Sequence, residues 1–356
     1  MNNDRTQIKP DSKHYNYALT DLEKLEKNYE IDLRSFGPDF FGWNDRLISL
    51  NDASNDLRQY SKTEGDDRII QAAASLLKEN NYRLMITDSG SQALTLSILL
   101  AVQEKRVIGL PLPYFPGFVG IAKAFAAKIF YYDSLNEYNA LEVIKDKCRQ
   151  HKVCLIINSP NNPTGKKLSH HFLDQLQLLA NDRDLTLLAD HTYFWTEREA
   201  NNANVGNIRV YSLGKALGLP GLRLGAIAVQ NDLHMAALIN LKRHMSLHSC
   251  PLAQRIALTI MFKHDINGLH KRWRKKLKFR MQELSGALDA TDTGHTLGIL
   301  GPFSLVYLNQ DIQTLIQGVP SEVFGVRSGG VRICHAGNEV DWQNLISLIR
   351  AESGYG

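Results

Sequence analysis

The sequence predicts an α/β protein with a mostly parallel central sheet, helices on both faces of that sheet, and a smaller α+β domain. From residue 84 onward, short apolar runs alternate with amphipathic stretches of helical periodicity, as in parallel sheets whose strands are buried on both faces. After about residue 265, a long helical stretch precedes short alternating strands. We therefore predict an N-terminal segment, 1–45, that packs with the small domain, a large domain, 46–265, and a small domain, 266–356.

Composition excludes several classes of protein. The 356 residues are 44% hydrophobic and 22% charged, which is typical of a globular protein. The net charge of +4 is small for this length, so nothing indicates binding to nucleic acid or to an acidic membrane surface. No apolar run is long enough to span a bilayer, and the first ten residues lack the apolar core of a signal peptide. We therefore expect a cytoplasmic protein.

The elements of the large domain follow from apolar runs and their flanking turns. Residues 31–41 are expected to be extended and to end in a turn. Five runs are predicted as strands buried on both faces: Arg106–Pro111, Lys128–Asp133, Val153–Asn158, Leu185–Asp190 and Gly225–Val229. An amphipathic helix, Phe172–Asn181, lies between two of these strands. This βα alternation is the basis of the predicted sheet.

The small domain is predicted to begin with a helix at His270–Leu288, followed by strands at Phe303–Asn309 and Val331–His335. The first part of this helix is strongly basic, but its apolar residues, Trp273, Leu277 and Phe279, approximate one helical stripe. A solvated helix face is therefore favoured over a nucleic-acid interface.

Cysteine and histidine spacings give no pattern of metal ligands. The four cysteines are scattered and include no Cys-x-x-Cys pair. His244 and His248 have helical spacing, but no acidic third ligand lies beside them. We therefore predict no metal site.

A Ser-Gly-Ser turn, Ser89, Gly90 and Ser91, follows a short apolar strand and begins an apolar helix. Unpaired backbone N–H groups and the positive end of the helix dipole can bind an anion at such a position. These three residues are therefore candidate phosphate ligands. A simple helix cap is the alternative.

Two predicted strands end in polar residues. The strand Val153–Asn158 continues into a rigid turn with two prolines, in which Asn162 is the polar group best placed to point into a pocket. Asp190 ends the strand Leu185–Asp190, where a carboxylate is costly unless it pairs with a cation. Tyr193 follows three residues later. A helix cap remains an alternative role for Asp190.

Lys215 has the most informative surroundings in the chain. Ser212 lies three residues before it, and Arg223 lies eight residues after it in a glycine-rich turn. A lysine can form a Schiff base with an aldehyde, and a serine with an arginine can bind a phosphate beside it. This combination predicts a pocket for pyridoxal phosphate, whose pyridinium nitrogen would pair with Asp190.

These motifs, Asn-x-Pro-Asn-Asn-Pro-Thr-Gly, Asp-x-x-Tyr and Ser-x-x-Lys with its later arginine, occur in the order found in class I/II aminotransferases. The chain resembles this family of fold type I pyridoxal-phosphate enzymes over roughly residues 31–350. The resemblance implies that Lys215 binds the cofactor covalently and that Asp190 pairs with its ring nitrogen. It implies that Asn162 and Tyr193 contact the ring hydroxyl. The implied phosphate ligands are Ser212, Arg223, Ser89, Gly90 and Ser91.

The resemblance assigns further residues. Phe115, in Pro-Tyr-Phe-Pro-Gly-Phe, would stack on the cofactor ring, with Tyr114 as the alternative. Tyr60 would reach the phosphate of a neighbouring subunit, which implies a homodimer. Arg332 would bind the substrate α-carboxylate by two parallel hydrogen bonds, with Gly37 and Asn162 beside it.

The sequence departs from the family pattern at three positions. Gly214 stands before the lysine, where the family usually has a hydroxyl residue. His191 replaces the more usual acidic residue after Asp190, and Phe115 replaces a commoner Tyr or Trp. The glycine puts one phosphate contact in doubt.

The resemblance implies a pyridoxal-phosphate-dependent aminotransferase that moves an amino group between an amino acid and a 2-oxo acid. Such an enzyme would act in amino acid metabolism, as part of a biosynthetic process. The alternative is a lyase or cyclase on the same scaffold, because two segments are similar to aminocyclopropane carboxylate synthases. A decarboxylase is less favoured, since Arg332 would hold the carboxylate in the ring plane. A non-catalytic binding module is disfavoured because Lys215, Asp190 and Arg223 are all present. Nothing in the sequence indicates which substrate side chain is preferred.

Overall fold

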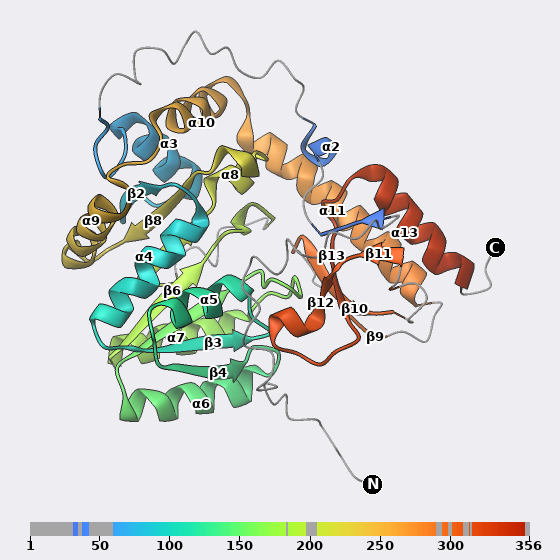
Figure 1. The fold of residues 1–356 in the computed structure, drawn as a ribbon, viewed down its shortest axis with the longest axis horizontal. Helices are drawn as coiled ribbons and strands as arrows, with labels where there is room; N and C mark the ends of the chain where they lie inside the picture. Colours follow the sequence, from blue (N-terminus) through green and yellow to red (C-terminus); the bar gives the residue numbers. More distant parts are fainter. Residues whose placement is uncertain are drawn as a thin grey trace.

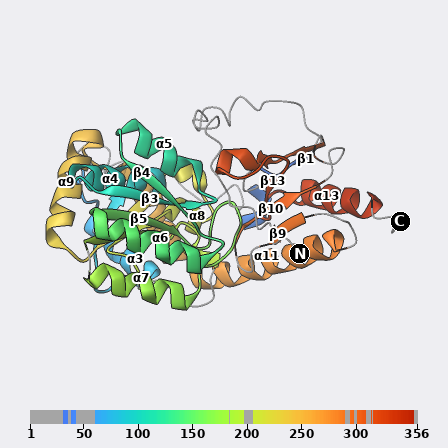
Figure 2. The same ribbon diagram turned by 90° about the horizontal axis from the view of Figure 1, so that it is seen from below.

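The structure, a computed structural model, contains a seven-stranded sheet with helices on both faces and a smaller four-stranded sheet beside it (Figure 1). The residues that it describes are 31–34, 38–42, 60–182, 184–196, 205–289, 294–297, 301–308, 313 and 315–352. A long helix, α11 (Ile266–Leu288), runs from the large sheet to the small one in both views (Figures 1 and 2).

The large sheet is mixed, with one antiparallel strand. Its strands in spatial order are β2 (Arg83–Thr87), β8 (Gly225–Val229), β7 (Ile208–Tyr211), β6 (Leu185–Asp190), β5 (Val153–Asn158), β3 (Val107–Leu112) and β4 (Ile129–Asp133). β8 is antiparallel to both of its neighbours, and the other four pairs are parallel. The predicted mostly parallel sheet is therefore confirmed.

The strand register brings distant parts of the chain to one edge of this sheet. Asn158 at the end of β5 pairs with Asp190 at the end of β6, and Asp190 pairs with Val210 near the end of β7. Because β8 runs the opposite way, its first residue, Gly225, pairs with Thr87, the last residue of β2. The turns that follow β2, β5, β6 and β7 therefore all leave from the same edge, where α/β sheets bind ligands.

Helices cover the two faces of the large sheet as separate layers (Figure 2). One face packs against α4 (Gly90–Gln103), α5 (Pro116–Ala124) and α9 (Asp232–Ser246). The other face packs against α6 (Glu137–Gln150) and α7 (His170–Asp182), with α3 (Asp67–Leu77) and α10 (Pro251–Lys263) beside them. Within the described part of the chain, no helix combines the length and the apolarity needed to cross a bilayer.

Three details differ from the sequence prediction. Ile208–Tyr211 forms a strand that was not among the five predicted runs. β4 alternates between buried and half-buried residues because it is an edge strand, so it is not buried on both faces. Pro38–Phe41 forms a short helix, α2, where an extended segment ending in a turn was expected. Phe40 and Phe41 from this helix lie in the apolar core.

The small sheet joins distant segments. Its strands in order are β12 (Val319–Pro320), β13 (Val331–Cys334), β10 (Phe303–Tyr307) and β9 (Gly294–Leu297), all antiparallel. A separate pair, β1 (Ile31–Asp32) with β11 (Ile316–Gln317), is parallel. Leu33 packs in one apolar cluster with α11 (Ile266–Leu288) and α13 (Glu339–Glu352).

The basic helix α11 is less solvated than its sequence predicts. Leu269, Trp273 and Leu277 are buried as a stripe, but Phe279 is 57% exposed and does not belong to it. Arg280 is 1% exposed, and its NH1 donates to the backbone oxygens of His335 and Gly337. One cation of the basic run therefore ties α11 to the chain after β13.

Among the described residues, three histidines are buried, and burial lowers the pKa of each below its ordinary value: His191 and His270 to about 4, and His335 to about 3. Each is therefore neutral in the folded protein at pH 5, whereas an unfolded histidine is charged there. Between about pH 6.5 and pH 4 the unfolded chain binds more protons, so stability falls as pH is lowered.

This linkage predicts the effect of His270→Gln. The ring Nε2 of His270 lies 2.7 Å from the Ala216 carbonyl oxygen, a contact that a glutamine amide can replace without titrating. We expect the loss of unfolding free energy between pH 7.5 and pH 5 to shrink by about 2 kcal/mol in this variant. Urea unfolding at both pH values measures it, with the exposed His151→Gln as control. An undiminished loss in His270→Gln contradicts the prediction.

Candidate active site

The start of α4 packs closely against two other turns at the sheet edge. Ser89 caps this helix, its Oγ accepting a hydrogen bond of 3.0 Å from the Gln92 N–H. A Cβ added to Gly90 would lie 3.2 Å from the Ser212 Cβ, and one added to Gly225 would lie 2.4 Å from the Ser89 carbonyl carbon. The structure therefore brings Ser89, Gly90 and Ser212 together, with glycine where the backbones meet.

The remaining two predicted phosphate ligands lie at the rim of this cluster. Ser91 is exposed in the first turn of α4, where backbone N–H groups have no acceptor within the helix. Arg223 is exposed, has left-handed backbone (φ +53°), and donates to the Pro220 carbonyl oxygen at 3.4 Å. Arg223 lies two residues before Gly225, whose backbone meets that of Ser89. Arg223 is therefore close in sequence to the contact between these two turns.

Lys215 and Tyr193 meet directly, although 22 residues separate them. Lys215 lies in the short helix α8 (Leu213–Ala216), which Ser212 caps. The Lys215 Nζ donates a hydrogen bond of 3.0 Å to the Tyr193 hydroxyl. Tyr193 is buried, and its ring meets the Phe303 ring edge-on at 5.3 Å between centroids. The segments that follow two adjacent strands, β6 and β7, thus bring the amine and the phenol together.

Gly214, the departure just before the lysine, has a steric explanation. A Cβ at this position would lie 2.9 Å from the Leu219 carbonyl oxygen. The Gly214 N–H also donates to the Leu224 carbonyl oxygen at 2.9 Å, and its carbonyl accepts from the Leu219 N–H at 2.7 Å. The turn after α8 folds back so tightly that a side chain does not fit without movement of the backbone.

Asp190 is buried at the end of β6. Its Oδ1 accepts a hydrogen bond of 3.0 Å from the Thr192 N–H. Burial raises the pKa of this carboxyl, and the Thr192 bond opposes that shift. The Asn158 amide donates to the Asp190 carbonyl oxygen at 3.4 Å, which joins the ends of β5 and β6. A cation at this carboxylate would favour its ionised form.

A buried ion pair lies behind the ends of β6 and β7. Arg209 NH1 is 2.9 Å from both carboxylate oxygens of Glu79, and each residue is 2% exposed. The Tyr211 hydroxyl also donates to Glu79. The ring of His191 stacks on that of Tyr211 with centroids 5.5 Å apart. His191, which replaces the usual acidic residue, therefore occupies an aromatic site beside a paired carboxylate.

Arg332 connects the small sheet to the large one. Its NH1 donates to the Asn162 Oδ1 at 3.0 Å, and its NH2 donates to the Arg34 carbonyl oxygen at 2.6 Å. The guanidinium carbon lies 4.4 Å from the centroid of the Phe303 ring. The Nε atom is buried without a hydrogen-bond partner, and no carboxylate lies within 4.0 Å of this side chain among the described residues. A partly buried cation without an anion indicates a binding site for one.

Tyr114 and Phe115 point to different surroundings. Tyr114 is buried, its N–H donates to the Phe324 carbonyl oxygen at 3.2 Å, and a Cβ at Gly325 would lie 2.5 Å from its ring. Phe115 is half-buried and meets the Phe118 ring edge-on at 5.5 Å. Tyr114 is therefore packed against the chain that follows β12.

Tyr60 is 85% exposed, and its ring meets that of His248 at 5.7 Å between centroids. Such exposure leaves the phenol accessible to another molecule. Gly37, the backbone group predicted beside the substrate carboxylate, lies outside the described residues.

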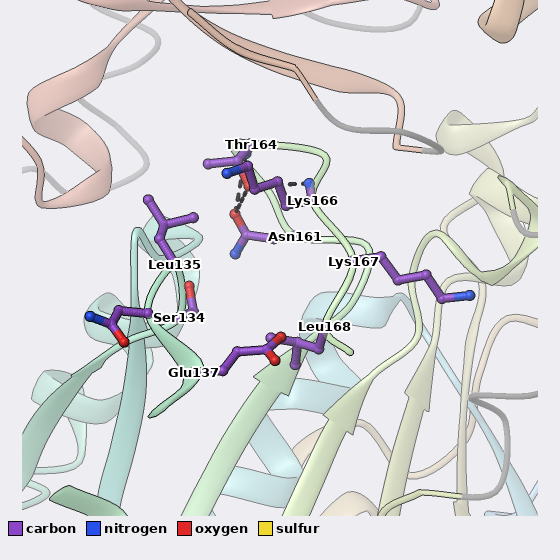
Figure 3. A pocket seen from close by; sticks show the side chains of 9 residues that line it. Ser134, Leu135, Glu137, Asn161, Thr164, Lys166, Lys167 and Leu168 are labelled. Carbon is purple, nitrogen blue, oxygen red and sulfur yellow. Dashed lines mark hydrogen bonds between the residues drawn. The ribbon is translucent and has the colours of Figure 1, made fainter. Parts of the chain in front are cut away.

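The turn that carries Asn162 also contributes Asn161 and Thr164 to the wall of a polar cavity of about 500 Å³ (Figure 3). The Asn161 side chain in its wall accepts from the Thr164 hydroxyl at 2.8 Å and donates to the Pro113 carbonyl oxygen at 3.2 Å. These bonds stay within the protein and hold the turn rigid. Lys215 does not line this cavity. The cavity is therefore separate from the contact of Lys215 with Tyr193 at the strand ends.

Several residues that contact the site were not predicted. Thr192 supplies the backbone donor to Asp190, Phe303 lies between Tyr193 and Arg332, and Arg34 contributes a carbonyl oxygen. Thr192 could have been found from its position two residues after Asp190. No sequence pattern marks Phe303 or Arg34, because their place depends on how the small sheet meets the large one.

Comparison with known proteins shows the family of this chain. The sequence model of aminotransferase class I and II matches residues 43–349. The chain belongs to this family, whose members use pyridoxal 5'-phosphate.

Individual relatives are distant. The chain is 25% identical over 187 residues to a probable aspartate aminotransferase of Methanocaldococcus jannaschii, covering 49% of this chain and 50% of that protein. It is 26% identical over 226 residues to 1-aminocyclopropane-1-carboxylate synthase 6 of Arabidopsis thaliana, covering 55% of this chain and 45% of that protein. The chain thus matches about half the length of these curated relatives.

Among solved structures, a double mutant of the Thermus thermophilus aspartate aminotransferase superposes with a TM-score of 0.78. The two share 19% sequence identity, over 94% of this chain and 95% of that one. This likeness shows the fold of the whole described chain.

The tight turn after α8 predicts a contrast between two glycine substitutions. Gly214→Ala is expected to lower the free energy of unfolding by about 1–3 kcal/mol, because the new methyl group meets a backbone oxygen. Gly286→Ala in α11 meets no atom within 4 Å and should raise it by about 0.5–1 kcal/mol. Urea unfolding of both variants tests this. A Gly214→Ala protein as stable as the wild type excludes the steric explanation.

Proposed function

We propose that this protein is a pyridoxal-phosphate-dependent aminotransferase that moves an amino group between an amino acid and a 2-oxo acid. The observation that carries the proposal is the shared edge at which Lys215 contacts Tyr193 while Arg332, which has no carboxylate partner among the described residues, contacts Asn162. The cofactor supplies an aldehyde for the lysine and a ring that accepts electrons.

The residues present fit that cofactor. Gly90 leaves room beside Ser212 that a Cβ would fill, and the first turn of α4 offers backbone donors for a phosphate. Arg223 would add a cation, because it lies two residues before Gly225, whose backbone meets Ser89 at the start of α4. A carboxylate buried like Asp190 is suited to a cationic ring nitrogen, which would oppose the effect of burial on its pKa. Phe115 is the aromatic available to stack on a ring, since Tyr114 packs against Gly325.

The protein groups would divide the work of proton transfer and binding. Lys215, once free, would be the base that takes the substrate α-proton at its Nζ and would pass it to the cofactor carbon that carries the transferred nitrogen. Tyr193 holds that Nζ in place by its hydrogen bond and, with Asn162, would contact the ring oxygen of a bound cofactor. Arg332 would bind the substrate α-carboxylate, because among the described residues its NH1 and NH2 bond only to the uncharged oxygens of Asn162 and Arg34. Gly37 would add a backbone contact to the same carboxylate.

We further propose a homodimer in which Tyr60 of one subunit reaches the cofactor phosphate of the other. The 85% exposure of Tyr60 supports this role. A cytoplasmic location and a biosynthetic role in amino acid metabolism remain predictions from the sequence. So does the division of the chain at residues 45 and 265.

A lyase or cyclase is the second candidate, because the matched relatives include an aminocyclopropane carboxylate synthase. Such an enzyme would use the same cofactor and the same lysine but would expel a group from the substrate. The match to the aminotransferase family model over residues 43–349 favours the first candidate.

A half-reaction separates the two. Given an amino donor alone, the wild-type protein is expected to convert its cofactor to the amine form and to release one equivalent of oxo acid. Absorbance and product mass measure both. Lys215→Ala should bind cofactor that borohydride no longer traps, and should lose at least about 10⁴-fold in rate, because the base is absent. Repeated turnover without an acceptor identifies the lyase or cyclase instead.

Arg332→Met is expected to raise KM for the amino donor at least about 30-fold, with a change in cofactor occupancy of less than about 2-fold, because charge-assisted bonds to the substrate carboxylate are lost. Arg327→Met removes an exposed arginine near the same sheet and should leave KM unchanged. Steady-state kinetics and cofactor absorbance measure the split. If the affinity for the amino donor and the cofactor occupancy fall by the same factor, carboxylate binding by Arg332 is excluded.

A further inference from the structure

Lys242 is a fully buried lysine in α9 that the proposed reaction does not use. Its relative exposure is 0%, and its Nζ donates two hydrogen bonds to backbone oxygens, to Thr63 at 2.5 Å and to Ile86 at 2.7 Å. Burying an ammonium group is costly unless its protons are bonded. The position of this side chain is therefore tightly determined.

The two carbonyl groups belong to segments that lead to phosphate ligands. Ile86 lies in β2, three residues before Ser89, the cap of α4. Thr63 lies in the turn three residues after Tyr60. The Ile86 N–H also donates to the Glu64 carbonyl oxygen at 2.8 Å, and a Cβ at Gly65 would lie 2.8 Å from the Ile86 side chain. One ammonium group thus joins the turn after Tyr60 to the strand before Ser89.

The charge of Lys242 has no direct counter-ion among the residues that the structure describes. No carboxylate lies within 4.0 Å of its Nζ in the described part of the chain. Burial lowers the pKa of Lys242 to about 8, although the negative charges of Asp88 and Glu64 oppose this shift at longer range. A buried positive charge of this kind is stabilised by an anion nearby, and the start of α4 is where a phosphate would supply one.

We propose that Lys242 is a positioning residue for the cofactor phosphate: it fixes the cap of α4 in its own subunit and the turn that presents Tyr60 to the neighbouring subunit. This inference rests on the proposed function. A general stabilising role would affect the binding of every part of the cofactor. The role proposed here affects the binding of the phosphate and not that of the aldehyde or the ring. Each phosphate site would then depend on two copies of Lys242, one from each subunit.

The test compares the affinities for pyridoxal phosphate and for pyridoxal, which lacks the phosphate. Lys242→Met keeps an unbranched side chain, one atom shorter than lysine, and removes its donors and charge. We expect pyridoxal phosphate to bind at least about 10-fold more weakly to this variant, because two carbonyl groups lose their charged donor. Pyridoxal affinity should change less than about 3-fold. Lys147→Met in α6, on the opposite face of the sheet, is the control and should change neither.

An equal loss of affinity for both compounds, or no loss for either, overturns the proposal. Gln254→Met is a milder second variant, should Lys242→Met not fold. Gln254 holds the same turn through the Asp66 N–H at 2.9 Å, and its removal should weaken pyridoxal phosphate binding selectively, about 3-fold. A non-selective effect there overturns the proposal as well. Wild-type protein that binds no pyridoxal phosphate would instead contradict the proposed function itself.

Discussion

The common edge of the large sheet is the constraint on which the rest of the site depends. In-register pairing of β5, β6 and β7 brings Asn158, Asp190 and Val210 side by side. Each strand then continues into the turn that carries one of the polar groups, so groups far apart in the sequence, such as Tyr193 and Lys215, meet at the strand ends. The spacing of the functional groups is therefore set by the backbone hydrogen bonds of the sheet, whose geometry varies little, and not by flexible loops.

Glycines let the turns at this edge approach one another. At Gly90, Gly214 and Gly225 an added Cβ would lie within 3.2 Å of another atom, in two cases a backbone atom. The reversed direction of β8 is part of the same arrangement, since it brings Gly225 against Ser89. This close packing places Ser212 beside the first turn of α4, whose backbone N–H groups can bind an anion.

Arg332 couples the two sheets because it contacts both at once. Its two terminal nitrogens bond Asn162 in the large domain and the Arg34 backbone in the N-terminal segment, while Phe303 lies against the guanidinium. An anion bound at Arg332 would therefore lie beside two segments that Arg332 contacts, the turn of Asn162 and the backbone of Arg34. The rigid turn around Asn161 makes one of these sides a fixed support.

The sequence by itself determined the α/β class, five strands of the large sheet and the residues that meet at its edge, because apolar periodicity and strand-end polarity are local signals. It did not reveal β7, the role of Gly214 or the burial of Arg280 within a basic run. Only the tertiary structure decided those features, along with the contact of Lys215 with Tyr193 and the placement of Phe303 and Lys242. Each depends on which segments pack together across long stretches of chain, and that packing leaves no periodic trace in the sequence.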